Sequence, residues 1–370
     1  MRSGKKIKLY LGVDPTSPRI HIGHTVPLLK LRDFQELGHE VYFLVGSFTA
    51  LIGDTSDKTE ARKAMTQEEV EENFKSYKEQ AAKILDFSKA KIVYNGDWLS
   101  KLGFKEILEL ANKFTVQQMI ERDLYRKRIE EGNPVGLHEF LYPLMQGYDS
   151  VALDVDLEVG GNDQLFNMLA GRTLQRILNE REKHVVTTEL IEGLDGRKMS
   201  KTYGNTVDIS EEPKEMYGKI MSMQDEMIIK YFTACTRVPL EEVSEMEKEM
   251  KEGSNPRDFK MKLASNLVEM YHSKGAAKEA EESFVSQFQK GNIPDDVEVF
   301  KVSSGEWKLV DLIAEIGLEK SKSQVRRLIE QGGIKLDQEK VSDIDAVLKV
   351  GKEEKLIQVG KRRFGKVISL

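Results

Sequence analysis

The chain has 370 residues and a net charge of −6, with 39% hydrophobic and 32% charged residues, a composition typical of a folded protein of two or three domains. No apolar run approaches the roughly 18 to 20 residues that cross a bilayer, so a membrane protein is not expected. A single cysteine, Cys235, excludes an intramolecular disulfide and a zinc site built from cysteines.

The first predicted elements are two strands with a helix between them. Ile7–Val13 predicts a strand rather than a signal peptide, because the run is short and leads directly into Asp14. Val41–Val45 is a compact apolar run, as expected of a strand buried on both faces. Apolar residues recur at helical spacing between the two runs, and Gly38 stands where a C-terminal cap belongs.

The alternation of strands and helices continues to about residue 208. Strand next to helix in this order predicts an α/β fold with a doubly wound, Rossmann-like parallel sheet, whose ligands bind beyond the carboxyl ends of the strands. The remaining elements expected in this region are helices at Gln67–Leu85, Phe104–Phe114, Val116–Glu130, Glu139–Asp149 and Gln164–Leu178, and strands at Lys91–Tyr94 and Val185–Thr188.

The pattern changes twice after the α/β region, which gives three predicted domains: 1–208, 209–293 and 300–370. The second is purely helical and strongly charged, and it ends in a turn-rich linker. The third is a small α+β unit, with short helices at Leu309–Ile316 and Ser323–Glu330 and strands from Ile334 onward. Residues 301–370 carry 15 basic and 11 acidic side chains, whereas residues 1–300 carry 41 and 51, so a mildly basic tail follows an acidic body.

The first motif with chemical content follows the first predicted strand. A proline-rich loop from Asp14 leads to His21, Ile22, Gly23 and His24, where a helix opens. Helix N-terminal amides with two imidazoles beside them form a natural phosphate site, and Gly23 leaves room for a flat base. A lone histidine in such a place is more often a helix cap, but the whole arrangement favours phosphate binding.

The second motif lies about 175 residues later, after the strand at Val185–Thr188. A glycine-flanked basic loop contains Lys198, Met199, Ser200 and Lys201. Lysines on such a loop suit an interaction that strengthens in a transition state, such as holding a departing polyphosphate. Alone, this spacing is usually a solvated surface. Together with the first motif it indicates nucleotide chemistry.

These two motifs resemble the HIGH and KMSK signatures of class I aminoacyl-tRNA synthetases. The neighbouring residues narrow the resemblance to the bacterial-type tyrosyl-tRNA synthetase family, from about Tyr10 to the C-terminus. They are the segments 10–16, 51–54, 142–149 and 160–164, which read YLGVDPT, LIGD, YPLMQGYD and GGNDQ. The resemblance implies that the chain activates L-tyrosine with ATP and transfers it to the 3′ end of tRNA(Tyr).

The resemblance implies a set of tyrosine-binding residues. Tyr10 and Asp149 match the pair that hydrogen-bonds the substrate phenol, and synthetases of this type are the known example of about 10⁵-fold rejection of phenylalanine without editing. Asp54, Tyr142 and Gln146 match the acceptors around the substrate ammonium. Tyr142, Gln146 and Asp149 are spaced four and three apart, so a helix places them on one face. Gln164 completes the set.

The resemblance also implies ATP-binding and catalytic residues. Gly12, Asp14, Gly161 and Asp163 match positions around the ribose and the reacting groups. Because the attacking carboxylate is already ionised, no nucleophilic side chain or general base is needed, and catalysis rests on positioning and on stabilising phosphate charge. The implied catalytic residues are Thr16, His21, His24, Lys198, Lys201 and Thr202, with Gly23, His24 and Lys201 also contacting ATP.

The third unit resembles the small RNA-binding domain of the same family, in the segment 321–334, which reads SKSQVRRLIEQGGI. Lys322, Arg326 and Arg327 near the start of a helix are expected to meet RNA phosphates. The helical domain corresponds to the family's anticodon-recognition region, although no residue in it can be assigned.

Further expectations follow from the resemblance. ATP is a substrate that brings Mg²⁺ with it, and no prosthetic group or protein metal site is expected. The partners are L-tyrosine, ATP and tRNA(Tyr), the location is cytoplasmic with no membrane partner, and a homodimer is implied, with residues 116–133 as an interface candidate.

Three alternatives remain open from the sequence. A related class I ligase for another aromatic amino acid, tryptophan above all, is disfavoured by Tyr10 and Asp149. A non-catalytic structured-RNA-binding protein is disfavoured because both signature motifs are intact. An adenylyl transferase acting on a free small molecule is disfavoured by the helical and basic C-terminal domains.

Overall fold

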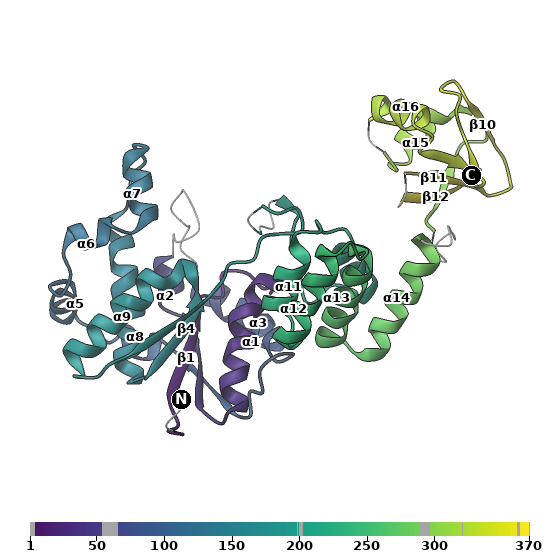
Figure 1. Ribbon diagram of the computed structural model, residues 1–370. Helices are drawn as coiled ribbons and strands as arrows, with labels where there is room; N and C mark the ends of the chain where they lie inside the picture. The colour runs from purple at the N-terminus through teal and green to yellow at the C-terminus, as the bar shows by residue number, and fades with distance from the viewer. Residues whose placement is uncertain are drawn as a thin grey trace. The chain divides into compact units, whose positions relative to one another are not determined.

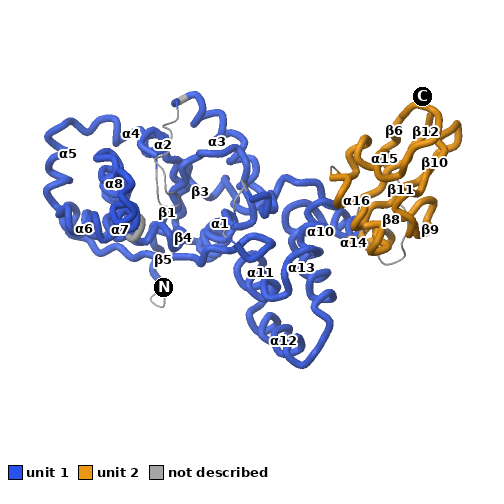
Figure 2. The backbone as a smooth tube through the Cα atoms, turned by 90° about the horizontal axis from the view of Figure 1, so that it is seen from above, with its two compact units in different colours: residues 1–280 blue, residues 281–370 orange. Residues whose placement is uncertain are grey.

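The computed structural model describes residues 4–53, 66–197, 199, 203–288, 297–319, 321–360 and 363–369, without the side chains of Gln67, Asp123 and Leu124. The chain forms two compact units, Met1–Ala280 and Glu281–Leu370 (Figure 1, Figure 2). In the described ranges, no helix is both long enough and apolar enough to cross a membrane.

Unit 1 is built on a five-stranded sheet in the order β3-β2-β1-β4-β5, and every neighbouring pair is parallel. This order reverses between β1 and β4, as in a doubly wound fold, and it confirms the predicted fold class. The reversal leaves a crevice beyond the carboxyl ends of these two strands. The strands are β1 (Lys8–Val13), β2 (Glu40–Val45), β3 (Ala90–Tyr94), β4 (Leu157–Gly161) and β5 (His184–Thr188).

Helices cover both faces of this sheet. Figure 1 shows α1 (Ile22–Glu36) and α3 (Gln67–Ala81) on one side and α8 (Tyr142–Leu153) and α9 (Leu165–Leu178) on the other. Shorter helices fill the connections: α2 (Thr49–Ile52), α4 (Gly96–Leu99), α5 (Phe104–Ala111), α6 (Val116–Ile120), α7 (Asp123–Glu130) and the 3₁₀ segments η1 (Leu137–Leu141) and η2 (Asn162–Gln164).

The sequence did not predict β4, the strand beside β1 at the centre of the sheet. Its residues Leu157–Gly161 include an acidic side chain and end in two glycines, which hides the apolar pattern. Four of its five residues, at positions 157–160, are buried, and β4 pairs with β1 on one side and β5 on the other. Burial on both faces, rather than local propensity, therefore makes this segment a strand.

Several predicted helices have different boundaries in the structure. The helices expected to end at Leu85 and Phe114 end at Ala81 and Ala111. The helix expected at Val116–Glu130 is broken at residues 121–122 into α6 and α7. The helix expected at Glu139–Asp149 begins at Tyr142 instead, after the 3₁₀ turn of η1. Pro143 lies in the first turn of α8, where its missing N–H costs no hydrogen bond, so it favours a helix start there.

The segment that follows the second motif is helical, as predicted. Within it α11 (Met227–Cys235) packs beside α1, and Tyr271 of α13 (Pro256–Tyr271) and Thr25 of α1 share a buried hydrogen bond of 2.8 Å between their hydroxyl oxygens. Arg237 also forms an ion pair with Glu36 at the end of α1. The other helices are α10 (Pro213–Met221), α12 (Leu240–Lys251) and α14 (Lys274–Phe288).

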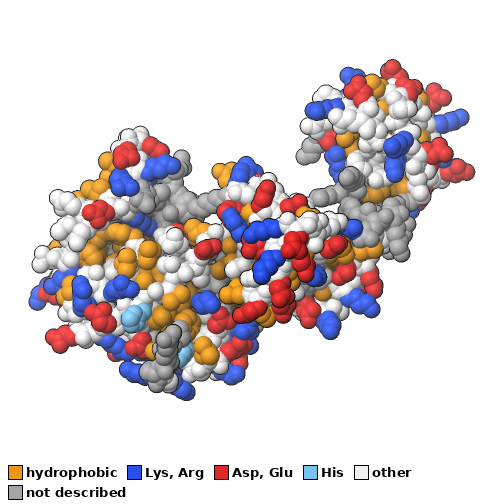
Figure 3. All heavy atoms as spheres, viewed as in Figure 1, with side chains coloured by type: hydrophobic (Ala, Val, Ile, Leu, Met, Phe, Trp, Pro, Cys, Tyr) orange, Lys and Arg blue, Asp and Glu red, His pale blue; other side chains and the backbone are white. Residues whose placement is uncertain are grey.

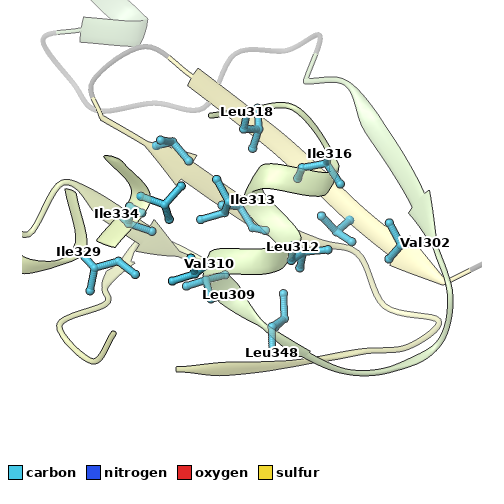
Figure 4. Close-up of a cluster of buried hydrophobic side chains, with 14 of the residues drawn as sticks. Val302, Leu309, Val310, Leu312, Ile313, Ile316, Leu318, Ile329, Ile334 and Leu348 are labelled. Atoms are coloured by element: carbon cyan, nitrogen blue, oxygen red, sulfur yellow. The ribbon is translucent and has the colours of Figure 1, made fainter. Parts of the chain in front are cut away.

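Unit 2 is an α+β unit with its own core, in which α15 (Leu309–Glu315) and α16 (Lys322–Glu330) pack on the strands. Figure 4 shows Leu312, Ile313, Ile329 and Ile334 meeting in this core. One sheet has the order β6-β12-β11-β8-β9, and β10 pairs with β7. The strands are β6 (Val299–Val302), β7 (Gly305–Lys308), β8 (Ile334–Leu336), β9 (Glu339–Lys340), β10 (Val347–Val350), β11 (Lys355–Val359) and β12 (Arg363–Ser369).

Candidate active site

One cavity opens at the carboxyl ends of β1 and β4, where the strand order reverses. Binding sites of doubly wound sheets lie at this position. The cavity brings together most of the residues singled out in the sequence. They are Tyr10, Gly12, Asp14, Thr16, His21, Gly23, His24, Tyr142, Gln146, Asp149, Gly161, Asp163 and Gln164.

Tyr10 and Asp149 lie deep in this cavity. The Tyr10 side chain comes from the middle of β1 and is fully buried, and its hydroxyl is 3.0 Å from Ser150 Oγ. Burial raises the pKa of Tyr10, and the carboxylates of Glu158 and Asp149 add to the effect. The phenol therefore stays protonated and offers a hydrogen-bond donor next to a carboxylate.

Asp149 is held by two donors on different oxygens. Trp98 Nε1 donates to Oδ1 at 2.8 Å and Asn95 Nδ2 to Oδ2 at 3.2 Å. Burial raises the pKa of Asp149, and these two hydrogen bonds act in the opposite direction. Trp98 and Asn95 were not predicted from the sequence, because they come from the short helix α4 and the residue before it, which no pattern marks.

The helix α8 presents three predicted residues to the cavity. Tyr142, Gln146 and Asp149 all line it, so the prediction that they share one helical face is confirmed. The Tyr142 hydroxyl donates to Asp14 Oδ2 at 2.9 Å, and Gln146 Nε2 donates to Glu158 Oε1 at 3.1 Å. The helix thus delivers a phenol, an amide and a carboxylate to one wall.

Asp14 is fixed at the end of β1 by a close approach of the backbone. Thr49 Oγ1 donates to Asp14 Oδ1 at 2.7 Å. A Cβ on Gly46 would lie only 1.8 Å from Asp14 Oδ1 and 2.4 Å from Thr49 Oγ1. Glycine at position 46 is therefore what allows this carboxylate to sit beside the carboxyl end of β2.

The first motif forms the start of α1. The His21 and His24 rings stack with centroids 3.6 Å apart, and His21 N donates to His24 Nδ1 at 3.3 Å. His21 is the residue that precedes the first helical turn, so it occupies the capping position as well as lining the cavity. Both imidazoles therefore lie where helix amides face a bound anion.

The second motif approaches the first through Met199. A Cβ on Gly23 would lie 3.2 Å from Met199 Sδ, and Met199 is buried and lines the cavity. Backbone hydrogen bonds from Ile22 N to Val207 O and from Ile209 N to Ile20 O join the segments that contain the two motifs. Segments some 175 residues apart are thus brought side by side.

The predicted residues Asp54, Lys198, Lys201 and Thr202 lie outside the described residues. Their roles therefore remain predictions from the sequence. Of residues 198–201, the structure describes Met199.

The end of β4 supplies the opposite wall of the cavity. A Cβ on Gly161 would lie 2.4 Å from Asp163 Oδ1, so the absence of a side chain lets the Asp163 carboxylate fold over the strand end. Gln164 Nε2 is 3.3 Å from Asp163 Oδ2, and Gln164 Oε1 accepts from Asn167 Nδ2 at 2.9 Å. These contacts hold the Asp163 carboxylate, which the resemblance assigns to ATP binding, and the Gln164 amide, which it assigns to tyrosine binding.

Lys183, Glu158 and Ser150 form a buried polar cluster at the floor of the cavity, which Glu158 lines, and the sequence did not predict it. Lys183 precedes β5, Glu158 lies in the unpredicted β4, and Ser150 follows Asp149 on α8. A charged residue inside an otherwise apolar strand was the one available signal for Glu158. No signal in the sequence pairs it with Lys183.

The predicted RNA-binding residues lie on α16 in unit 2, with Lys322 at its first position and Arg327 in its last turn. Lys322, Arg326 and Arg327 are exposed, while Val325 and Ile329 on the other face are buried in the core. Lys322 forms an ion pair of 2.8 Å with Asp311 on α15. Side chains of both charges appear on this unit in Figure 3.

Within the described ranges, no group of three or more His, Cys, Asp or Glu side chains is arranged to hold a metal ion.

Two family models match the chain. The model of class I tRNA synthetases (W and Y) matches residues 2–289, and the model of the tyrosine–tRNA ligase SYY-like C-terminal domain matches residues 287–365. Together they span both units.

Similar proteins carry the same description. The tyrosine–tRNA ligases of Carboxydothermus hydrogenoformans and Thermotoga maritima are each 48% identical to the chain; the matches cover 100% and 98% of it and 91% and 90% of those proteins. The Archaeoglobus fulgidus tyrosyl-tRNA synthetase, solved in complex with L-tyrosine, has a TM-score of 0.60 and 26% identity, over 75% of this chain and 90% of that one. Family models, relatives and cavity agree, and the chain belongs to the class I tRNA synthetases, in the group of the tyrosine–tRNA ligases.

Proposed function

We propose that the cavity binds L-tyrosine and ATP together, forms tyrosyl-adenylate and pyrophosphate, and passes the tyrosyl group to tRNA(Tyr). The observation that carries the specificity is the buried pair Tyr10 and Asp149. A phenol donor and a carboxylate acceptor deep in a cavity fit the hydroxyl of tyrosine, and both would lose a partner if phenylalanine were bound. The substrate ammonium then lies toward Gln146 and Tyr142, with Asp54 assigned from the sequence.

ATP extends from this pocket toward the start of α1. Its phosphates meet Thr16, His21 and His24, and its ribose lies near Gly12, Gly161 and Asp163. The tyrosine carboxylate attacks the α-phosphate in line, while helix amides and imidazoles stabilise the charge that develops. Lys198, Lys201 and Thr202, placed by sequence on the second motif, hold the departing pyrophosphate. ATP enters as its Mg²⁺ complex, with the ion held by phosphate oxygens.

The second step needs tRNA, and the rest of the chain is suited to hold it. We assign adenylate formation to residues 1–208, anticodon recognition to the helices of residues 209–293, and further RNA contacts to residues 300–370. The exposed cations of α16 meet RNA phosphates. With these partners the enzyme works in the cytoplasm, where tRNA is charged.

A homodimer is proposed from an exposed apolar surface on unit 1. Phe104 and Leu108 of α5 are 76% and 53% exposed, and Val116 and Leu137 are 65% and 82% exposed. Hydrophobic side chains are visible on this part of the molecule in Figure 3. Such a patch is typical of an interface. The double variant Phe104→Glu, Leu137→Glu is expected to halve the mass measured by light scattering, and an unchanged mass would reject this surface.

The specificity is tested by ATP–pyrophosphate exchange with two variants of the phenol pair. Tyr10→Phe and Asp149→Asn each remove a group that contacts the substrate hydroxyl, so each is expected to lower kcat/KM for tyrosine by about ten- to a hundredfold. The value for phenylalanine should change far less. Equal losses for both amino acids would show that the pair does not read the hydroxyl.

A further inference from the structure

The cluster of Lys183, Glu158 and Ser150 contains an ammonium group whose three hydrogens all have acceptors. Lys183 Nζ donates to Ser150 Oγ at 2.7 Å, to Met168 O at 3.1 Å and to Glu158 Oε2. Lys183 is 1% exposed and Glu158 2%. Three acceptors around one nitrogen match the three hydrogens of an ammonium group, so a protonated Lys183 is fully hydrogen-bonded here, and Glu158 opposes the lowering of the Lys183 pKa that burial causes.

Two glycines make the space for this cation. A Cβ on Gly171 of α9 would lie 2.5 Å from Lys183 Nζ and 2.7 Å from Ser150 Oγ. A Cβ on Gly147 of α8 would lie 3.1 Å from the backbone nitrogen of Gly171. The helices α8 and α9 therefore approach each other through glycines, and the ammonium occupies the room that side chains would have filled.

Glu158 connects the ion pair to the ammonium-binding end of the pocket. Its Oε1 accepts from Gln146 Nε2 at 3.1 Å, while its Oε2 accepts from Lys183. Gln146 Oε1 is buried and has no hydrogen-bond partner within the described ranges, although the residue lines the cavity. A carboxylate accepts and cannot donate, so it selects the amide orientation in which the Gln146 carbonyl is left for a ligand.

Ser150 connects the ion pair to the phenol-binding end. Its Oγ accepts from Lys183 and lies 3.0 Å from the Tyr10 hydroxyl. With one Ser150 lone pair taken by the ammonium, donation from the Ser150 hydroxyl to Tyr10 satisfies both groups. The Tyr10 proton then points away from Ser150, toward Glu158, with which Tyr10 also interacts through a side-chain hydrogen bond, or toward a ligand in the cavity.

We propose that Lys183 and Glu158 are positioning residues of the tyrosine site: Glu158 aims the Gln146 carbonyl at the substrate ammonium, and Lys183, through Ser150, aims the Tyr10 hydroxyl at the substrate phenol. One buried ion pair thus sets both ends of the amino-acid pocket. The inference rests on the proposed function, in which Gln146 and Tyr10 contact tyrosine.

Charge balance explains why a lysine accompanies the glutamate. Asp149 and Asp14 already bring carboxylates to the cavity, and Glu158 adds to the rise in the pKa of Asp149 that burial causes. Without Lys183 the Glu158 charge would lack its counter-ion and would act on Asp149 unopposed. Lys183 therefore helps to keep Asp149 ionised as an acceptor.

The test compares single and double variants in ATP–pyrophosphate exchange, with the full chain. Lys183→Met is expected to raise KM for tyrosine about tenfold or more and to leave KM for ATP within about twofold. Adding Glu158→Gln to Lys183→Met removes the unpaired negative charge and keeps a carbonyl that accepts from Gln146. In the double variant KM for tyrosine should therefore be at least threefold lower than in Lys183→Met, which corresponds to recovery of about half of the lost binding free energy.

The matched control removes a cation two residues away. Arg181 forms ion pairs with Asp154 and Asp156 outside the cavity. Arg181→Met is expected to affect thermal stability without changing KM for tyrosine. A rise in KM for tyrosine equal to that of Lys183→Met would show a general effect of the strand and would overturn the proposal, as would an unchanged KM in folded Lys183→Met.

Two further variants keep the test decisive. Ser150→Ala is milder and is expected to lower the ratio of kcat/KM for tyrosine over phenylalanine several-fold; an unchanged ratio would overturn the link to Tyr10 even if Lys183→Met does not fold.

Gln146→Ala separates the proposed function from the positioning role. If it leaves KM for tyrosine unchanged, the assignment of Gln146 to the substrate fails; if it raises KM while Lys183→Met does not, only the ion-pair proposal fails.

Discussion

Asp149 is a buried carboxyl group, and we propose that it accepts a hydrogen bond from the substrate phenol. Trp98 and Asn95 donate to it, yet burial outweighs them and raises its pKa. The residue is therefore both well held and costly to ionise. Such a carboxylate is typical of a functional site, where charge is kept for binding rather than for stability.

The raised pKa of Asp149 predicts a pH dependence of tyrosine affinity. As the pH falls through a raised pKa, the carboxylate gains a proton and stops accepting from the substrate hydroxyl, so affinity is expected to fall toward acidic pH. Free tyrosine has no group that titrates between about pH 5 and pH 8, which leaves the protein as the cause. Calorimetric titration over this range checks the prediction, with Asp149→Asn as the variant whose profile should be flatter. A flat profile in the unaltered protein would contradict it.

The strands and helices around the cavity place its residues because the backbone comes close to side chains at glycine positions. β1 and β4 provide the floor of the cavity, α8 provides one wall, and the start of α1 lines the end where we propose that the phosphates bind. Glycine is required at position 46, since a side chain there would collide with Asp14 and Thr49.

Gly46→Ala is expected to lower kcat/KM for adenylate formation by about tenfold or more, because the methyl group displaces the Asp14 carboxylate from the strand end. Gly218→Ala on α10 is the matched control, since a Cβ there meets nothing within 4 Å. The control should keep full activity and be slightly more stable, by up to about 1 kcal/mol of helix propensity. Steady-state pyrophosphate exchange and thermal denaturation of both variants check this, and equal activities would contradict the role of Gly46.

The elements with a clear hydrophobic periodicity and the motifs with fixed spacing could be predicted from the sequence. β1, β2 and α1 lie close to their predicted positions, and one face of α8 carries the three expected residues. β4 was missed because its burial comes from both neighbouring layers and not from an apolar run. The Lys183–Glu158 pair could not be found for the same reason: it joins an unpredicted strand to a residue 25 positions away.

At the scale of the whole molecule, adenylate formation and tRNA binding are assigned to different parts of the chain. The cavity lies within unit 1, whereas Lys322, Arg326 and Arg327 lie on the exposed face of α16 in unit 2. The two activities are therefore expected to respond separately to substitution.

The triple variant Lys322→Gln, Arg326→Gln, Arg327→Gln is expected to raise KM for tRNA about tenfold or more and to reduce the slope of log affinity against log salt by about one for each lost phosphate contact. Filter binding at several salt concentrations measures the slope, and aminoacylation measures KM. Pyrophosphate exchange in the same preparation reports whether unit 1 is intact. An unaltered salt slope would exclude α16 from the RNA interface.

We propose that the cavity selects tyrosine through Tyr10 and Asp149. The most direct measurement is amino-acid-dependent ATP–pyrophosphate exchange with tyrosine, phenylalanine and tryptophan side by side and no tRNA present. Exchange with tyrosine, and only background rates with the other two, is the predicted result. Exchange with tryptophan or phenylalanine at a rate comparable to that with tyrosine would contradict it.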